Sequence, residues 1–181
     1  MILRKAKEHE VRAVAKLYDD VIDFLEANKN YPGWRKGIYP TIADASADFS
    51  KGTLYVLVED SNDSDDEIIQ GSVVLNHLPE KGYDQGKWLK DVDYSDIWII
   101  RRLVVTPASI GRGVADTLLK EMDLLAKNEG IKSLRLDVYE INAPAIALYE
   151  RNGYRYAGTV DIGLAMIGLE WFKLFEKVVT Y

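Results

Sequence analysis

The sequence predicts a mixed α/β fold, and three observations favour it. Two strand-like segments, 53–60 and 68–78, flank an acidic run, which is typical of an antiparallel pair. Between residues 97 and 140, a β-rich segment, an amphipathic segment and a second β-rich segment follow one another at the spacing of a parallel crossover. The chain has 181 residues, of which 48% are hydrophobic, enough for one sizeable core. We therefore expect residues 1–181 to form a single domain.

Each element is predicted from the spacing of its apolar residues. In the first half of the chain, the expected elements are a short strand at 1–6, a helix at about 8–27, a short helix at 41–52 and the strand pair 53–60 and 68–78. In the second half, they are a strand at 97–106, a helix at 114–128, a strand at 133–140, a short helix with Pro144 in its first position and Gly153 after its last turn, and strands at 154–160 and 169–179. The acidic run Glu59–Glu67 is expected to be a solvated hairpin tip, because it lacks the glycine and the glutamate of a calcium-binding loop.

Charge and cysteine content exclude several kinds of function. The formal net charge is −6, so we expect no nucleic-acid partner and no membrane partner. The sequence has no cysteine, which excludes disulfides, thiolate metal sites and cysteine nucleophiles. Its two histidines, His9 and His77, have no ligand spacing to each other or to carboxylates, so we expect no metal. The sequence shows no signal-peptide core and no apolar segment of membrane length, and we expect a cytoplasmic protein.

The glycine-rich turn Ser109–Ala115 is the first candidate for chemistry. It joins the end of a strand to the start of a long helix, where backbone N–H groups lack partners within the helix and the macrodipole favours an anion. Small residues let a phosphate approach those donors, so the amides of Ile110–Ala115 are expected to cradle a diphosphate. The dinucleotide-binding fingerprint needs Gly or Ala where Asp116 stands, and no P-loop is present. For two glycines alone, a tight turn without a ligand is the alternative explanation.

The residues around the turn favour a ligand. The segments "RRLVVTPASIGRGVADTLL" and "SLRLDVYEINAPAIALYERNGY" resemble the two central motifs of the GNAT superfamily, the acyl-CoA-dependent N-acetyltransferases. In that pattern, a strand ending in Val-x-Pro leads into a glycine turn and a helix, and a second strand leads into an Asn and a short helix with a Tyr before Gly-aromatic. The matching residues are Val105, Pro107, Gly113, Ala115, Asn142, Tyr149, Gly153 and Tyr154.

The resemblance implies a GNAT-like mixed, mostly antiparallel sheet of six to seven strands, with a central parallel splayed pair and helices on both faces. It also implies acetyl-CoA as co-substrate, with its pantetheine arm beside the first strand and its diphosphate in the turn. The residues expected to bind it are Leu103, Val104, Val105, Ile110, Gly111, Arg112, Gly113, Val114, Ala115, Asn142 and Tyr149. Ile110 departs from the pattern, because the family has Arg or Gln there; since that residue acts chiefly through its backbone, we expect binding to be retained, with Arg112 supplying charge. Helix capping explains Asn142 equally well.

The implied reaction is direct attack of a primary amine on the acetyl group. Tyr149 is expected to be the general acid, because a phenol with a pKa of about 10 stays protonated at neutral pH; burial on a helix stripe is the alternative. The general base is left open. Many family members have a glutamate upstream of the strand end, where this sequence has only apolar residues, Ile97–Ile100. Glu140 is our catalytic candidate, and Asp96, His77 or a water chain are the alternatives.

The expected acceptor is a small-molecule or peptide amine. The irregular segments 31–39 and 79–96 flank the cleft in the family arrangement, so we expect them to set specificity. Arg101 and Arg102 are adjacent, and a regular strand would direct them to opposite faces, one toward the cleft. A homodimer is left open. Because the upstream glutamate is missing, a non-catalytic acyl-CoA-binding or regulatory domain of the same fold is the alternative function, and a protein-binding scaffold is a third.

Overall fold

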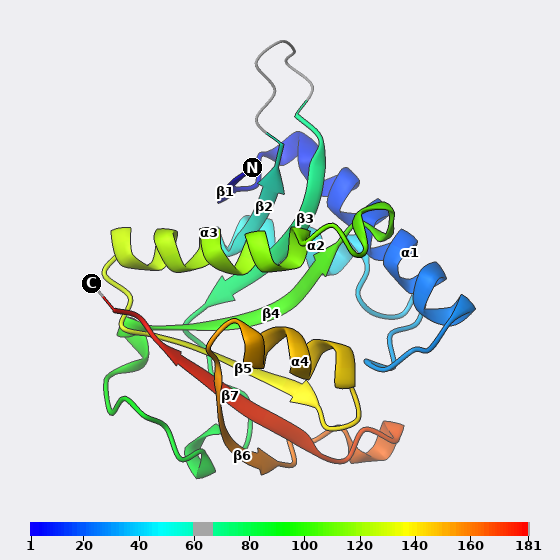
Figure 1. The fold of residues 1–181 in the computed structure, drawn as a ribbon. Coiled ribbons are helices and arrows are strands. Elements are labelled where there is room, and N and C mark those ends of the chain that lie inside the picture. The colour runs from blue at the N-terminus through cyan, green and yellow to red at the C-terminus, as the bar shows by residue number, and fades with distance from the viewer. Residues whose placement is uncertain (60–66, 181) are drawn as a thin grey trace. The chain divides into compact units, whose positions relative to one another are not determined.

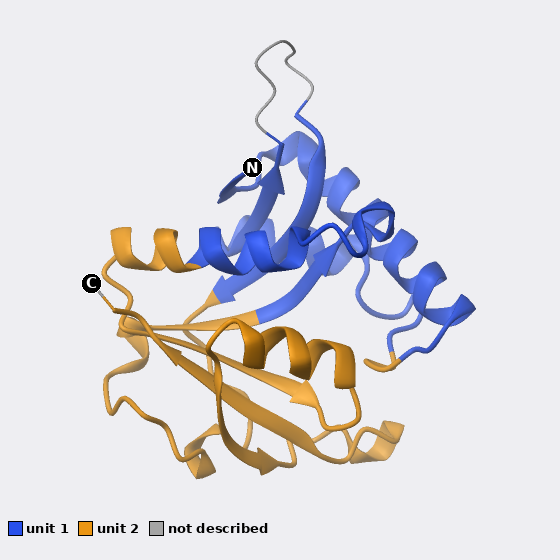
Figure 2. Ribbon diagram, viewed as in Figure 1, with its two compact units in different colours: residues 1–30, 34–75, 101–122 blue, residues 31–33, 76–100, 123–181 orange. Residues whose placement is uncertain are grey.

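The computed structural model describes residues 1–59 and 67–180. The chain divides into two compact units, coloured separately in Figure 2. The first unit comprises residues 1–30, 34–75 and 101–122, and the second comprises residues 31–33, 76–100 and 123–181. Most of the predicted hairpin tip falls on residues 60–66, outside the described residues. The prediction of a single domain stays a prediction.

The described residues form seven strands and four α-helices, drawn in Figure 1. The strands are β1 (Ile2–Lys5), β2 (Leu54–Val58), β3 (Ile69–Asn76), β4 (Ile97–Val105), β5 (Ser133–Tyr139), β6 (Arg155–Val160) and β7 (Phe172–Val178). The helices are α1 (Val11–Ala27), α2 (Ile42–Ser50), α3 (Val114–Asn128) and α4 (Ala143–Arg151). The strand order is β1-β2-β3-β4-β5-β7-β6, and β4 contributes one half to each unit. The predicted mixed, mostly antiparallel sheet with one parallel pair is confirmed.

Helices cover both faces of the strands in the first unit. On one face, α1 packs its apolar stripe, including Val14 and Tyr18, against Val56 of β2 and Val74 of β3. This stripe exists because apolar residues recur at helical spacing, and a short 3-10 turn at Glu8–Glu10 precedes the helix. β3 also approaches β4 closely, because a Cβ at Gly71 would lie 2.7 Å from the Val104 carbonyl oxygen and 3.1 Å from Leu118 of α3. The N-terminal part of α3 therefore lies on the face opposite α1.

The second unit is built on the parallel pair and on two antiparallel ladders. β4 pairs with β5 at Ile97–Ile99 and Ser133–Arg135, and β7 lies between β5 and β6. On one face, the ring of Tyr149 from α4 contacts that of Phe175 from β7. On the other face, the long segment between β3 and β4 packs Tyr83 into an apolar cluster with Ile97, Ile99 and Leu174. A segment without a long helix thus covers this face.

The ends of α4 show which capping signals held. Asn142 is the residue before the helix, and its Oδ1 accepts a hydrogen bond from the Ala145 N–H at 3.3 Å. Pro144 is the second residue of the helix, so the prediction that it would be the first was wrong by one residue. Gly153 has φ +85°, the left-handed conformation expected after the last turn. None of the helices in the described residues is both long and apolar enough to span a membrane.

Candidate active site

The glycine turn of the first unit keeps open space in front of its backbone. After β4 and a 3-10 turn at Pro107–Ser109, the chain passes through Gly111 and Gly113, which have φ values of +80° and +74°. Apart from each glycine's own chain neighbours, no heavy atom of the described residues lies within 4 Å of a Cβ built on either glycine. Only glycine adopts such φ values without strain, so the conformation explains the residue type. The open space means that both positions offer their backbone to solvent.

Hydrogen bonds hold the turn at the start of α3. The Thr106 N–H donates to the Gln70 carbonyl at 2.9 Å, and the buried Ser109 hydroxyl donates to the Thr106 carbonyl at 2.8 Å. The Thr117 N–H donates to the Gly113 carbonyl at 3.0 Å. In the regular i→i−4 pattern, the three N–H groups before Thr117 have no carbonyl partner within the helix. The turn therefore has a fixed backbone at a helix N-terminus, a position that favours anions in general.

Side chains at the turn leave its backbone accessible. Ile110 and Arg112 are both exposed, as are Gly111 and Gly113. Leu103 and Val105 of β4 are half-buried, whereas Val104 is buried among apolar residues of the first unit. The departure at Ile110 thus removes a polar side chain without changing the shape of the backbone.

Arg102 has a structural role that corrects the regular-strand expectation. Its φ is +46°, which breaks the alternation of side chains along β4. The guanidinium forms an ion pair with the buried Asp48 and donates a hydrogen bond to the Tyr39 hydroxyl at 2.8 Å. It also lies over the Tyr39 ring, 5.5 Å from the centroid. Arg102 therefore ties β4 to α2 and to the aromatic segment before it, so adjacency alone does not place Arg101 and Arg102 on opposite faces.

In the second unit, α4 places Tyr149 in an aromatic cluster. Its ring centroid lies 5.5 Å from that of Tyr154 and 6.5 Å from that of Phe175. Burial, with the negative charge of Asp137 adding to it, raises the pKa of the Tyr149 phenol. Tyr149 is therefore protonated at any physiological pH. Packing of its ring and donation from its hydroxyl are compatible roles.

Asn142 and Glu140 lie where β5 leads into α4. The Asn142 amide oxygen caps the helix, as the capping explanation predicts. Glu140 follows the last residue of β5, and its backbone N–H donates to the Trp171 carbonyl at 3.0 Å. Glu140 is half-exposed, so solvent reaches it.

The two other base candidates have structural partners. Asp96 forms an ion pair with Lys132 at 2.6 Å. The Nδ1 of His77 lies 2.9 Å from the Tyr94 carbonyl oxygen and 2.7 Å from the Ile97 carbonyl oxygen. Because a carbonyl only accepts, Nδ1 is the donor in these contacts. Both residues therefore help to position the segment before β4.

Two residues of the second unit were missed by the sequence reasoning. Asp137 of β5 accepts a hydrogen bond from the buried Tyr83 hydroxyl at 2.7 Å, and burial, with the charge of Asp137 adding to it, raises the Tyr83 pKa well above its ordinary value. A signal was available, because Asp137 is a carboxylate on a strand whose neighbours Leu136 and Val138 are buried. Nothing in the sequence pairs it with Tyr83, which lies 54 positions away.

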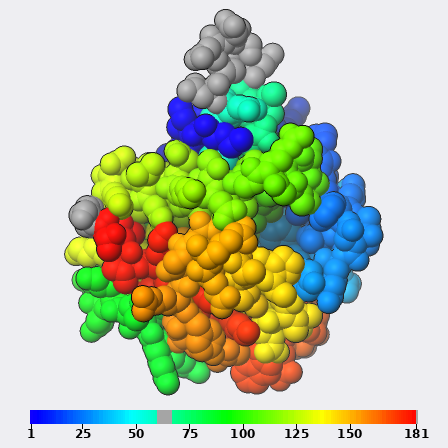
Figure 3. All heavy atoms as spheres, viewed as in Figure 1, coloured from blue at the N-terminus to red at the C-terminus, as the bar shows by residue number. Residues whose placement is uncertain are grey.

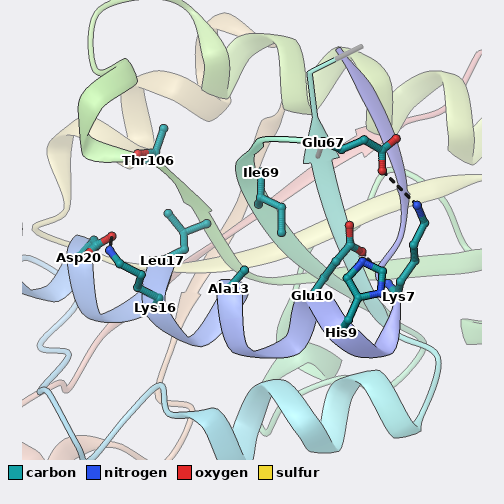
Figure 4. Close-up of a pocket in the computed structure, with 10 residues that line it drawn as sticks. All are labelled: Lys7, His9, Glu10, Ala13, Lys16, Leu17, Asp20, Glu67, Ile69 and Thr106. Atoms are coloured by element: carbon teal, nitrogen blue, oxygen red, sulfur yellow. Dashed lines mark hydrogen bonds and ion pairs between the residues drawn. The ribbon is translucent and has the colours of Figure 1, made fainter. Parts of the chain in front are cut away.

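The predicted residues are divided between the units. Leu103–Val105 and Ile110–Ala115 belong to the first unit, whereas Glu140, Asn142 and Tyr149 belong to the second. A pocket of about 350 Å³ in the first unit holds none of them (Figure 4). Charged side chains that line this pocket pair with each other, Lys7 with Glu67 and Lys16 with Asp20. In the described part of the chain, no group of three or more His, Cys, Asp or Glu residues could hold a metal ion.

Comparison with known proteins agrees with the motifs and the fold. Residues 14–154 match the acetyltransferase (GNAT) family model. An acetyltransferase of the GNAT family from Streptococcus agalactiae has a similar structure, with a TM-score of 0.80 and 22% identity over 99% of this chain and 95% of that one. The ribosomal-protein-S18-alanine N-acetyltransferase of Escherichia coli has a TM-score of 0.66 and 14% identity over 99% and 94%. The yncA protein of Salmonella typhimurium, solved with its cofactor acetyl-CoA, has a TM-score of 0.65 and 16% identity over 100% and 95%.

The chain belongs to the acetyltransferase (GNAT) family. The family match includes the glycine turn, Asn142, Tyr149 and the Gly153-Tyr154 pair, so it spans both segments that carry the resemblance. In general terms the protein is therefore an acetyltransferase, and the predicted family is confirmed.

Proposed function

We propose that the protein is an acetyl-CoA-dependent N-acetyltransferase that moves the acetyl group directly to a primary amine. The observation that carries this proposal is the fixed turn at the start of α3, in which Gly111 and Gly113 are left-handed and face open space. Gly130 is also left-handed with open space around it, so what distinguishes this turn is its place before the first turn of α3, where backbone N–H groups lack partners within the helix. Family membership supports the same choice.

The residues of the turn fit the diphosphate of acetyl-CoA. The N–H groups of Ile110 and Arg112 already donate to the Pro107 and Ser109 carbonyls, at 3.2 Å and 3.0 Å, which corrects the expectation that every amide of the turn binds the diphosphate. The N–H groups of Gly111, Gly113, Val114 and Ala115 would donate to the phosphate oxygens, and the exposed Arg112 side chain would add charge. The Leu103–Val105 segment, in which only Val104 is buried, would offer its backbone to the amides of the pantetheine arm, with Asn142 as a further contact. Acetyl-CoA supplies the activated acetyl group. The Salmonella typhimurium structure supports this choice, since that protein was solved with its cofactor acetyl-CoA.

Tyr149 would stabilise the departing thiolate. Its raised pKa keeps the phenol protonated, so the hydroxyl is always available as a donor. A thiol has a pKa of about 8.5, below that of the phenol, so complete proton transfer from Tyr149 is uphill. Donation of a strong hydrogen bond to the sulfur therefore suits this residue, with solvent supplying the proton in the end.

Glu140 is the proposed base. It is half-exposed at the end of β5, whereas Asp96 is held by Lys132 and the Asp137 carboxylate is held by the Tyr83 hydroxyl. Replacing Glu140 with Gln should lower kcat/KM at least tenfold at pH 7, because a charged amine must lose a proton before it attacks. The loss should shrink as the pH rises toward the pKa of the amine. Asp137→Asn is the matched comparison, and a larger loss in that variant would move the base to Asp137.

Two measurements on the same protein test the proposed activity. Acetyl-CoA should raise the melting temperature, and amines should release free CoA thiol in a colorimetric assay. Stabilisation by acetyl-CoA without turnover on any amine would favour the non-catalytic acyl-CoA-binding alternative, which the missing upstream glutamate keeps under consideration. The absence of both responses would contradict the cofactor assignment and leave the protein-binding scaffold.

A further inference from the structure

The pocket of the first unit lies along α1, and the proposed acetyl transfer does not use it. Figure 4 shows this pocket, which we call the α1 pocket. Its apolar part is formed by Ala13 and Leu17 of α1 and Ile69 of β3, and its polar part includes Lys7 and Thr106. Its volume of about 350 Å³ lies within the range of ~300 to 1,000 Å³ that is typical of small-molecule sites. Residues 1–30, which include α1, contribute to the molecular surface, where they are coloured blue in Figure 3.

The backbone around the α1 pocket is ordered. Ala13, Leu17 and Asp20 lie four and three residues apart, so they share one face of α1 over a length of about 10 Å. Thr106 is held by its N–H, which donates to the Gln70 carbonyl at 2.9 Å. The walls of the pocket are therefore in place before a ligand binds.

Two carboxylates that line the α1 pocket already have strong donors. Glu10 accepts hydrogen bonds from the Arg4 guanidinium at 2.7 Å and 3.0 Å and from the Lys7 N–H at 2.6 Å. Glu67 accepts one from Arg4 and one from Lys7 Nζ, the latter at 3.1 Å. A cationic ligand would have to compete with these donors for the same oxygens.

Donors, in contrast, remain available at this end of the α1 pocket. A lysine ammonium has three N–H donors, and within the described residues the hydrogen-bond partner of Lys7 Nζ is Glu67. Because Arg4 also forms an ion pair with Glu67, Lys7 can turn to a ligand without leaving that carboxylate unpaired. His9 lies beside Lys7 in Figure 4, and its ring can donate as well. The available groups thus favour a ligand that accepts hydrogen bonds and carries negative charge.

We propose that the α1 pocket binds a small monocarboxylate with an apolar chain. The carboxylate accepts hydrogen bonds from Lys7 Nζ, and the chain lies on Leu17 and Ile69. The other end of the pocket suits the carboxylate less well. There Lys16 is held by Asp20 at 2.5 Å, and within the described residues Asp20 has no second ion-pair partner. This inference goes beyond the proposed acetyl transfer and does not rest on it.

Four matched ligands test the chemistry of the α1 pocket: hexanoate, hexanamide, hexylammonium and acetate. Hexanamide lacks the charge, hexylammonium has the opposite charge, and acetate lacks the chain. Binding to the whole chain is followed by the backbone amide signals in two-dimensional NMR spectra. We expect hexanoate to bind at least tenfold more tightly than the other three, and to shift the amide signals of Ala13, Ile69 and Thr106.

Two pairs of variants locate the ligand. Lys7→Ala should raise the Kd for hexanoate at least fivefold, whereas Lys5→Ala, at an exposed lysine that does not line the pocket, should leave it unchanged. Ala13→Phe should fill the pocket and abolish binding. Arg12→Phe, at the neighbouring exposed position of α1, should bind hexanoate as the wild type does. The melting temperature of each variant shows that it is folded.

Several results would overturn the proposal. Preference for hexylammonium, or equal affinity for hexanoate and hexanamide, would mean that the pocket does not select a carboxylate. Equal losses in Lys7→Ala and Lys5→Ala would contradict the role of Lys7. Signal shifts centred on residues 111–115 would place the carboxylate at the glycine turn instead. Because none of these measurements uses acetyl-CoA, a failure of the proposed function would leave their outcome unaffected.

Discussion

The glycine turn in the first unit offers its backbone, whereas the Tyr149 neighbourhood in the second offers a side chain. At the turn, the exposed side chains of Ile110 and Arg112 leave the backbone open, and the shape depends on two left-handed glycines. Around Tyr149, the proposed function depends on a buried side chain in an aromatic cluster. We infer that binding at the turn tolerates substitutions of residues other than its glycines. Turnover at Tyr149, in contrast, should respond to the loss of a single atom. Four predictions test this difference, from the largest expected effect to the smallest.

The buried ion pair of the second unit gives the largest expected effect. Glu176 is fully buried and accepts hydrogen bonds from the Ser133 hydroxyl at 2.6 Å and from Arg135 Nε at 3.0 Å. Glu176→Ala would remove the carboxylate that pairs with Arg135 and leave the Arg135 charge buried over the Trp88 ring. We expect a loss of about 3 to 5 kcal/mol in the free energy of unfolding, measured by urea denaturation.

An exposed pair in the first unit provides the control for Glu176. Asp20→Ala removes the ion pair with Lys16. The Lys16 side chain is 74% exposed and the Asp20 side chain is 46% exposed. Its loss should cost less than about 1 kcal/mol. If Glu176→Ala were as mild as Asp20→Ala, the second unit would not depend on its buried polar contacts.

Tyr149→Phe should have the next largest effect, on turnover. Removing the hydroxyl keeps the ring packed against Tyr154 and Phe175, so the fold should survive. We expect kcat to fall well over tenfold, and each factor of ten corresponds to about 1.4 kcal/mol of barrier. Affinity for CoA should change little. Tyr156→Phe, which removes an exposed hydroxyl bonded to Thr159, is the matched control, and equal turnover in both variants would remove Tyr149 from its assigned role.

Sequence reasoning predicted the elements better than the contacts between them. Periodicity gave β5 and α3 within one residue at each end, because a buried face forces regular spacing of apolar residues. The positive φ of Arg102 was not predicted, because an ion pair with Asp48, 54 positions away, holds it. Glu176 and Arg135 are 41 positions apart, and only the register of β5 and β7 brings them together. Contacts of this kind depend on the whole fold.

The candidate site was predictable where it rests on local geometry. The sequence predicted a tight glycine turn before α3, and the left-handed Gly113 fits it; the Asn142 cap follows from its place before Pro144. Tyr149 was identified by its motif, and its role stays a prediction. The base could not be predicted, because the neighbours of Asp96 and Asp137 come from distant segments, Lys132 and Tyr83.

A change at the turn should have a moderate effect, on binding. Gly113→Ala puts a Cβ at φ +74°, which costs about 1 to 2 kcal/mol in a conformation that favours glycine. Relief of this strain would move the amides that donate to the diphosphate. We therefore expect the Kd for CoA to rise roughly five- to tenfold, measured by calorimetry.

Gly130→Ala separates strain from binding. Gly130 has φ +75° and follows the C-terminal end of α3. As at Gly113, no heavy atom of the described residues other than its chain neighbours lies within 4 Å of an added Cβ. The Gly130→Ala variant should lose as much stability as Gly113→Ala, and it should bind CoA as tightly as the wild type does. Equal CoA affinity in both variants would show that the turn does not grip the ligand through its backbone.

The smallest effect is expected at Glu10, where the first unit does rely on side-chain charge. Burial by itself would raise the pKa of the Glu10 carboxyl, but hydrogen bonds from Arg4 and from the Lys7 N–H outweigh it and lower the pKa. A carboxyl with a lowered folded pKa stabilises the protein above its unfolded pKa of about 4.3, and this stability disappears as the pH falls through the folded pKa. Glu10→Gln should therefore melt a few degrees below the wild type at pH 7, and this difference in melting temperature should disappear below about pH 4. The exposed neighbour Glu8, changed to Gln, should show no such pH dependence. A gap for Glu10→Gln that stays constant down to pH 3 would mean that packing of this side chain, and not its charge, secures the start of α1.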